Sequence, residues 1–166
     1  MKSVFNSKYW PELDRGTLNE EEAVKLFCSC EPDLSEEIIS VMEKWKDMLL
    51  PMEESIELLK KLKSNGYSIY VLSNYHRQAF HKIKEENDFF NIIDGGVISF
   101  EINYIKPQRE IYQFLLEKYK IKAEETLFID DMEINIKAAE DVGIRAVLFT
   151  DIDEVKEKLY KMDINI

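Results

Sequence analysis

The chain of 166 residues has no long apolar run. A membrane-spanning helix needs roughly 18 or more consecutive apolar residues, and no segment approaches that length. We therefore expect no membrane partner. The first ten residues, MKSVFNSKYW, also lack the apolar region of a signal peptide, which favours a cytoplasmic location.

Positive charge is scarce relative to negative charge. The chain has 22 Lys and Arg against 33 Asp and Glu, a formal net charge of -11. Such a field repels a phosphate backbone, and no local cluster of Lys or Arg offsets it. We expect no nucleic-acid partner, and a small anionic ligand only at a site that supplies its own cations.

Cysteine is limited to Cys28 and Cys30, which a single residue separates. That spacing is poor geometry for a mutual disulfide and supplies only half of a structural zinc set. His76 or His81 could complete a metal site, but two reduced thiols in a cytosolic protein are the simpler interpretation.

Residues 1–50 contain no strand pattern and are predicted to be a small helical subdomain. Asn19 and Glu22 form a capping-box pattern at the start of one helix, and a second helix is expected to start at residues 33–35. Pro51 then marks a boundary.

Residues 51–166 alternate between helical and strand patterns. Strands that alternate with crossover helices predict an α/β fold with a parallel sheet covered on both faces. The expected helices are 52–66, 76–86, 108–119, 134–142 and one from about 152, and the expected strands are 67–73, 96–99, 127–129 and 144–149.

Polar residues follow two of these strands and open one helix. Ser73 and Asn74 follow one strand, Lys106 opens a helix, and Asp130 and Asp131 follow the strand 127–129. Such points converge at one edge of a parallel sheet. Two adjacent carboxylates need a nearby cation, such as a lysine or Mg²⁺, and the whole set suits a phosphate and Mg²⁺. The alternative is that the two aspartates only cap the following helix.

Three strings, VLSN, IKPQREIY and FIDDMEINIKAAEDVGI, resemble motifs two, three and four of the haloacid dehalogenase (HAD) superfamily. The likeness is to its small-capped phosphatases, such as sugar-phosphate phosphatases and the phosphatase domain of soluble epoxide hydrolases. WPELDRGTLNEEEA resembles the start of their cap. The resemblance implies a HAD-like Rossmannoid core over residues 51–166, a partial helical cap over 1–50, and a Mg²⁺-dependent phosphomonoesterase acting on a small phosphorylated metabolite.

The same resemblance implies roles for the polar residues. Ser73 and Asn74 would bind the phosphoryl group, and Lys106 would hold it beside the nucleophile. Asp131 would contact Mg²⁺, while Asp130 would pair with Lys106 or share the metal site.

The chain departs from the family in its first motif. These enzymes attack phosphate with an aspartate at the end of the first strand, and nothing before Trp10 resembles that strand. In the string LDRGTL the nucleophile would fall on Leu13 and the general acid on Arg15, with no preceding strand. We therefore expect the chain as written to be inactive and its Mg²⁺ site to be weak.

The missing strand would lie between the strands of Ser73 and Asp130. Those strands would pair directly, borrow a strand or expose backbone groups. Residues Lys2–Phe5 are a candidate substitute, although a short one. A segment exchanged with a second copy of the chain is another, which would give a homo-oligomer.

Other interpretations remain open from the sequence. The gene product could be longer, with Met1 an internal methionine, or the chain could be a non-catalytic binding or assembly module. A dehalogenase suits the metal-binding pattern less well. His76 could face a pocket or only start a helix, and Trp10 and Trp45 could line a substrate entrance or pack the cap.

Overall fold

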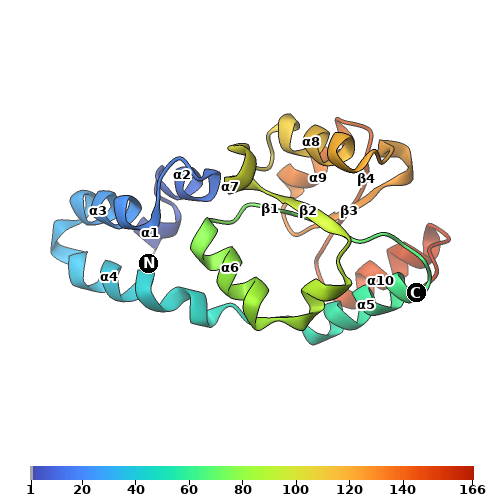
Figure 1. Ribbon diagram of the computed structural model, residues 1–166, viewed down its shortest axis with the longest axis horizontal. Helices are drawn as coiled ribbons and strands as arrows, with labels where there is room; N and C mark the ends of the chain where they lie inside the picture. Colours follow the sequence, from blue (N-terminus) through green and yellow to red (C-terminus); the bar gives the residue numbers. More distant parts are fainter. Residues whose placement is uncertain (1) are drawn as a thin grey trace. The chain divides into compact units, whose positions relative to one another are not determined.

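The structure, a computed structural model, describes residues 2–166 (Figure 1). The chain forms two compact units, although the sequence predicted a single boundary near residue 51. Unit 1 comprises the chain up to Pro51, Ser73–Phe90 and Ile98–Ile105, and unit 2 comprises Met52–Leu72, Asn91–Val97 and Lys106–Ile166. Within residues 2–166, no helix has both the length and the apolar character needed to cross a membrane.

Unit 1 is built mainly from helices, as the sequence predicted for its first 50 residues. Asn19 and Glu22 form the predicted capping box at the start of α3, with both of its hydrogen bonds present. The helical elements are α1 (Lys2–Phe5), α2 (Trp10–Arg15), α3 (Glu20–Cys30), η1 (Pro32–Leu34), α4 (Ser35–Lys44), η2 (Trp45–Met48), α6 (Arg77–Glu86) and α7 (Ser99–Ile102), and η3 (Asp88–Ile92) runs on into unit 2.

Two predictions about the start of the chain are decided by these helices. Lys2–Phe5 is helical, so it does not substitute for a strand. The string LDRGTL lies at the end of α2, where Gly16 caps the helix in a left-handed conformation, and it does not follow a strand. It therefore does not have the local structure of the family's first motif.

The core of unit 1 joins the first four helices. Ile38 and Met42 of α4, four residues apart on one face of the helix, are buried, whereas Ile39 is exposed. The buried residues of this core are Val4, Leu13, Ala23, Phe27, Ile38 and Met42.

Two features disfavour a side chain at Gly16: its left-handed backbone conformation and the close approach of α7. Its φ is 78°, and a Cβ added there would lie 2.9 Å from the Cβ of Phe100. We expect Gly16→Ala to lower the free energy of unfolding by about 2 kcal/mol, from strain and overpacking together. Gly66→Ala is the matched control, since Gly66 has a φ of 88° but nothing within 4 Å of an added Cβ. If urea denaturation gave equal losses of unfolding free energy for the two variants, the close contact with Phe100 would make no contribution.

Unit 2 contains the alternating helices and strands that the sequence predicted. The elements are α5 (Glu53–Ser64), β1 (Tyr70–Ser73), β2 (Gly95–Ile98), α8 (Arg109–Tyr119), η4 (Ala123–Glu125), β3 (Leu127–Asp130), α9 (Glu133–Glu140), β4 (Arg145–Leu148) and α10 (Ile152–Lys161); the last residues of β1 and β2, Ser73 and Ile98, already belong to unit 1. Each strand has four residues: β1 and β4 are shorter than the expected strands 67–73 and 144–149, whereas β3 is one residue longer than the expected 127–129.

The strands form two separate pairs rather than one continuous sheet. β3 and β4 pair in parallel, with Leu127 opposite Arg145 and Asp130 opposite Leu148, which confirms the predicted parallel pairing there. β1 pairs with β2, and within the described residues β1 is not hydrogen-bonded to β3. The strands of Ser73 and Asp130 therefore do not pair directly, and the interruption falls where the first strand was expected.

A hydrophobic core of unit 2 lies between β4 and two helices, α5 and α10, which run side by side (Figure 1). In α8, Ile111 and Leu115 are buried, whereas Phe114, which the helical spacing also favours as an inward residue, is exposed. The buried residues of the α5–β4–α10 core are Leu58, Leu62, Val147, Ile152, Val155 and Leu159.

Candidate functional site

Asp130 is the last residue of β3, and its side chain is buried at the start of the following turn. Its Oδ2 accepts a hydrogen bond from Lys106 Nζ at 2.6 Å. Its Oδ1 accepts from the backbone N–H of Met132 at 3.0 Å and from Asn135 Nδ2 at 2.8 Å. Three donors therefore orient one carboxylate, and one of them carries a full positive charge.

Lys106 forms a buried ion pair with this carboxylate. The Lys106 side chain is 11% exposed and the Asp130 side chain 5%. Lys106 Nζ also lies 5.5 Å from the ring centroid of Phe128, over its face. Removing one partner of such a pair leaves a desolvated charge without compensation.

A second layer of contacts fixes Asn135. This residue is buried in the first turn of α9, and its backbone carbonyl accepts a hydrogen bond from the Tyr112 hydroxyl at 3.0 Å. Burial, and then the negative charge of Asp130, raise the pKa of Tyr112, so it remains a neutral donor. The sequence analysis did not single out Tyr112, since a tyrosine within a helical apolar pattern gives no signal beyond core packing.

Asp131 is exposed, in contrast to its neighbour. Its carboxylate is the kind of hard oxygen ligand that Mg²⁺ prefers, whereas the Asp130 oxygens already accept three hydrogen bonds. Among residues 2–166, no group of three or more His, Cys, Asp or Glu side chains could hold a metal ion. The available ligand atoms are therefore of the chemical type that Mg²⁺ binds, with Asp131 as an exposed carboxylate, but there are few of them.

Ser73 and Asn74 lie in the other unit. Ser73 ends β1, and both residues belong to unit 1, whereas Lys106, Asp130 and Asp131 belong to unit 2. Their predicted convergence on a single phosphate site therefore stays a prediction.

Cys28 and Cys30 are free thiols.

Unit 1 contains a cavity of about 590 Å³, which we call the cap cavity. Trp10 and Trp45 both line it, and Asn74 and Asp14 are among its polar wall residues. Both tryptophans also pack against the core of unit 1, so they line a cavity and pack the helices at the same time. Aromatic contacts join them as well, since their ring centroids lie 5.3 Å apart.

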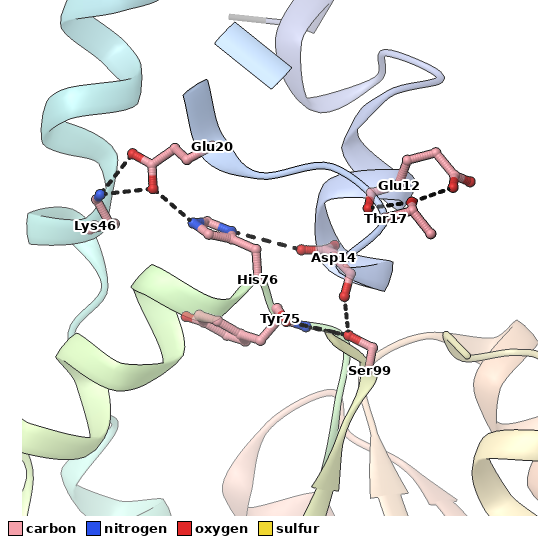
Figure 2. A network of polar contacts seen from close by, with 8 residues as sticks. All are labelled: Glu12, Asp14, Thr17, Glu20, Lys46, Tyr75, His76 and Ser99. Atoms are coloured by element: carbon pink, nitrogen blue, oxygen red, sulfur yellow. Dashed lines mark hydrogen bonds and ion pairs between the residues drawn. The ribbon is translucent and has the colours of Figure 1, made fainter. Parts of the chain in front are cut away.

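A polar network lies next to the cap cavity (Figure 2). His76 precedes α6 and is 1% exposed, and its Nε2 lies 3.5 Å from Glu20 Oε2 and its Nδ1 4.0 Å from Asp14 Oδ1. Lys46 donates to both carboxylate oxygens of Glu20, at 2.8 and 3.0 Å. Neither ring nitrogen of His76 has a hydrogen-bond partner among the described residues.

Burial shifts the titration of the two central groups in opposite directions. It raises the pKa of Asp14 to about 7, against hydrogen bonds from the Trp10 side chain and the His76 backbone. It lowers the pKa of His76 to about 4, against the attraction of Glu20. Near neutral pH, His76 is therefore uncharged, and Asp14 is close to the midpoint of its titration.

Ser99 anchors this network from α7. Its hydroxyl donates to the backbone carbonyl of Asp14 and accepts from the backbone N–H of Tyr75 at 3.0 Å (Figure 2). The residue is fully buried. One serine thus holds the end of α2 against the loop that carries His76, and no local sequence pattern indicated this role.

Comparison with known families gives one match over most of the chain. The family model of the haloacid dehalogenase-like hydrolases matches residues 5–143. The chain is 28% identical to the sesquiterpene phosphatase astK of Aspergillus oryzae, over 90% of this chain and 76% of that protein. It is 32% identical to the GMP/IMP nucleotidase YrfG of Escherichia coli, over 66% of this chain and 50% of that protein.

Other relatives are much longer than this chain. It is 26% identical to the drimenol cyclase drtB of Aspergillus calidoustus, over 94% of this chain but 30% of that protein. Among solved structures, a HAD family enzyme of Bacteroides thetaiotaomicron in complex with magnesium and inorganic phosphate superimposes with a TM-score of 0.74 at 23% identity, over 93% of this chain and 82% of that one. At that identity the superposition supports the fold alone.

Proposed function

Because the chain belongs to the haloacid dehalogenase-like hydrolases, we propose that its site is that of a Mg²⁺-dependent phosphomonoesterase for a small phosphorylated metabolite. The observation that carries this proposal is the buried pair of Lys106 and Asp130, which Asn135 and Met132 orient at the end of a parallel strand. Phosphatases and a nucleotidase among its relatives support the same reaction class.

Each side chain has a defined task in this proposal. Lys106 places a fixed positive charge where phosphoryl oxygens would bind, and Asp130 holds that ammonium group in place. Ser73 and Asn74 would donate hydrogen bonds to phosphoryl oxygens, and Asp131 would hold Mg²⁺. When bound, the metal would neutralise charge on the phosphoryl group.

By the resemblance to the family, no aspartate of these 166 residues stands in the position of the nucleophile, and among residues 2–166 no strand pairs with both β1 and β3. Covalent phosphoryl transfer needs that carboxylate. The polypeptide as written would therefore keep the cationic half of the site without the group that attacks phosphate.

The purified chain is accordingly expected to release no phosphate from p-nitrophenyl phosphate above background, with or without Mg²⁺. A longer product of the same gene, if an in-frame strand ending in an Asp-containing motif precedes Met1, is expected to be active and to lose activity with Asp131→Ala. Robust Mg²⁺-dependent turnover by the 166-residue chain, abolished by Asp131→Ala, would contradict the inactivity.

A non-catalytic binding module is the second candidate, favoured by an intact cavity in a chain without a nucleophile. It predicts a rise in melting temperature with a ligand in the absence of turnover. The names of the relatives do not select that ligand, since they include a sesquiterpene phosphatase and a GMP/IMP nucleotidase.

A further inference from the structure

Three aromatic rings that meet at steep angles line the cap cavity. The ring centroids of Phe5 and Trp10 lie 4.6 Å apart with an interplanar angle of 58°, and those of Trp10 and Trp45 lie 5.3 Å apart at 71°. Phe5 and Trp45 meet at 78°, with their centroids 6.3 Å apart. The faces of aromatic rings carry partial negative charge and attract cations. Rings in three orientations therefore border a space that suits positive charge.

Asp14 adds a carboxylate to the same wall. Among the described residues that line the cavity, it is the acidic one. Its side chain is 16% exposed, and it accepts hydrogen bonds from the Trp10 side chain and the His76 backbone. Within residues 2–166 it forms no ion pair with a lysine or an arginine, and the contact that it has at such a distance is with His76 Nδ1 at 4.0 Å. A largely buried carboxylate is costly when no cation compensates its charge.

The side chains of the loop before α6 do not supply that cation. Burial lowers the pKa of His76 to about 4, and burial together with the charge of Asp14 raises the pKa of Tyr75 to about 12, so both are uncharged near neutral pH. Lys46 pairs with Glu20 at 2.8 Å, on the opposite side of the His76 ring from Asp14 (Figure 2). The loop therefore leaves the carboxylate without a counter-charge.

The basic side chains of α2 and α4 near Asp14 are directed to other partners or to water. Arg15 Nη1 donates to the backbone carbonyl of Asn103 at 3.2 Å, and its Nε donates to Glu12 Oε1 at 3.4 Å. Lys44 lines the cavity but is exposed, so water solvates its charge. A positively charged ligand in the cavity would supply the missing charge.

We propose that the cap cavity is a binding site for a small organic cation with an alkylated nitrogen, whose charged head lies against Asp14 and the aromatic rings. Most wall residues are aromatic or aliphatic, and an alkylated nitrogen needs fewer hydrogen-bond acceptors than a primary ammonium group. The volume, about 590 Å³, lies within the range of roughly 300–1,000 Å³ typical of small-molecule pockets. The inference goes beyond the proposed function, since all of its residues belong to unit 1 and it involves no phosphate.

The test compares acetylcholine with 3,3-dimethylbutyl acetate, an uncharged molecule of nearly the same shape. The fluorescence of Trp10 and Trp45, the two tryptophans of the 166-residue chain, reports events at the cavity wall. Acetylcholine is expected to change the emission saturably and to bind at least about tenfold more tightly than the uncharged molecule at pH 8. Sodium chloride at equal ionic strength is expected to give no saturable change.

The affinity for acetylcholine is expected to rise about tenfold from pH 6 to pH 8. Burial raises the pKa of Asp14 to about 7, so the carboxylate is mostly protonated at pH 6 and mostly charged at pH 8. The cation binds the charged form and releases the proton as it does so. The uncharged molecule has no charge to pair with Asp14, and its affinity is expected to be equal at the two pH values.

Two variants with matched controls locate the bound cation. Asp14→Asn removes the charge and keeps the shape, and Asp33→Asn makes the same change at an exposed residue outside the cavity. Phe5→Leu removes a ring at a side chain that is 39% exposed, and Phe114→Leu does so in α8 at 40% exposed. Asp14→Asn is expected to weaken acetylcholine binding about tenfold at pH 8 and to abolish its pH dependence, and Phe5→Leu to weaken it about threefold. Both controls are expected to bind as the unchanged chain does.

Binding of the uncharged molecule separates loss of charge from loss of structure, because Asp14→Asn is expected to leave it unchanged, and circular dichroism checks that each variant is folded. The inference is wrong if acetylcholine gives no saturable change, if the uncharged molecule binds as tightly, or if folded Asp14→Asn binds acetylcholine as the unchanged chain does. These outcomes are independent of the proposed function, since none of them depends on phosphate release.

Discussion

Replacing Lys106 with methionine is expected to lower the free energy of unfolding by about 3 kcal/mol or more, because it leaves the Asp130 carboxylate buried without its cation. The two groups meet at 2.6 Å, and neither side chain is more than 11% exposed. Methionine keeps most of the packing of the aliphatic part of the lysine side chain, so the lost free energy of unfolding measures the effect of removing the positive charge. Urea denaturation at constant pH measures it.

Lys122→Met is the matched control. Lys122 meets Glu125 at the same distance, 2.6 Å, but these side chains are 64% and 66% exposed. Water already solvates both charges, so this variant is expected to unfold almost as the unchanged chain does. Adding Asp130→Asn to Lys106→Met removes the uncompensated charge and is expected to recover part of the loss. Equal effects of the two lysine variants would show that burial does not strengthen the Lys106 pair.

The alternation of helices and strands could be predicted because each element carries its own periodic signal. The capping box of Asn19 and Glu22, the parallel pairing of β3 with β4 and the final helix all depend on residues close in sequence or on one apolar run. The missing first motif implied a missing strand, but it left open whether β1 and β3 would pair directly; among residues 2–166 they do not.

The apolar periodicity does not identify the buried residue where a buried polar contact decides which side chain faces inward. In α9 the helical spacing of Ile134, Ala138 and Ala139 favours an inward position for Ile134, but Ile134 is exposed and Asn135 is buried. The reason is the Asp130 carboxylate, which needs a donor from the first turn of the helix and receives it from Asn135. A pattern of apolar residues contains no information about the hydrogen bonds that a buried charge requires.

The network around His76 could not be predicted from the sequence. Its members come from four separate stretches of the chain and form no motif: Asp14 and Glu20, Lys46, His76, and Ser99. The sequence left open whether His76 faces a pocket or only starts a helix. In the structure it precedes α6 and is also buried, with carboxylate oxygens of Asp14 and Glu20 within 4.0 Å of its ring nitrogens.

Asp14→Asn is expected to remove a pH-dependent loss of stability. The pKa of Asp14 is about 7 in the folded chain, above its ordinary value of 3.8, because burial disfavours the charged form. Between those values the folded state holds a proton that the unfolded state has released, so the free energy of unfolding falls as pH rises. The loss reaches about 4 kcal/mol by pH 7. The advantage of Asp14→Asn over the unchanged chain should therefore grow from pH 4 to pH 7 and then level off.

Titration of His76 changes the free energy of unfolding with pH in the direction opposite to titration of Asp14. Its pKa is about 4 in the folded chain, below its ordinary 6.5, so the unfolded state binds the extra proton between these values and stability rises with pH, by about 3 kcal/mol. In the unchanged chain the two effects nearly cancel from pH 4 to pH 6.5, and Asp14→Asn should expose the rise due to His76. Urea denaturation across this range measures both profiles, with the exposed Asp153→Asn as control. Parallel profiles for Asp14→Asn and the unchanged chain would mean that Asp14 titrates normally despite its burial.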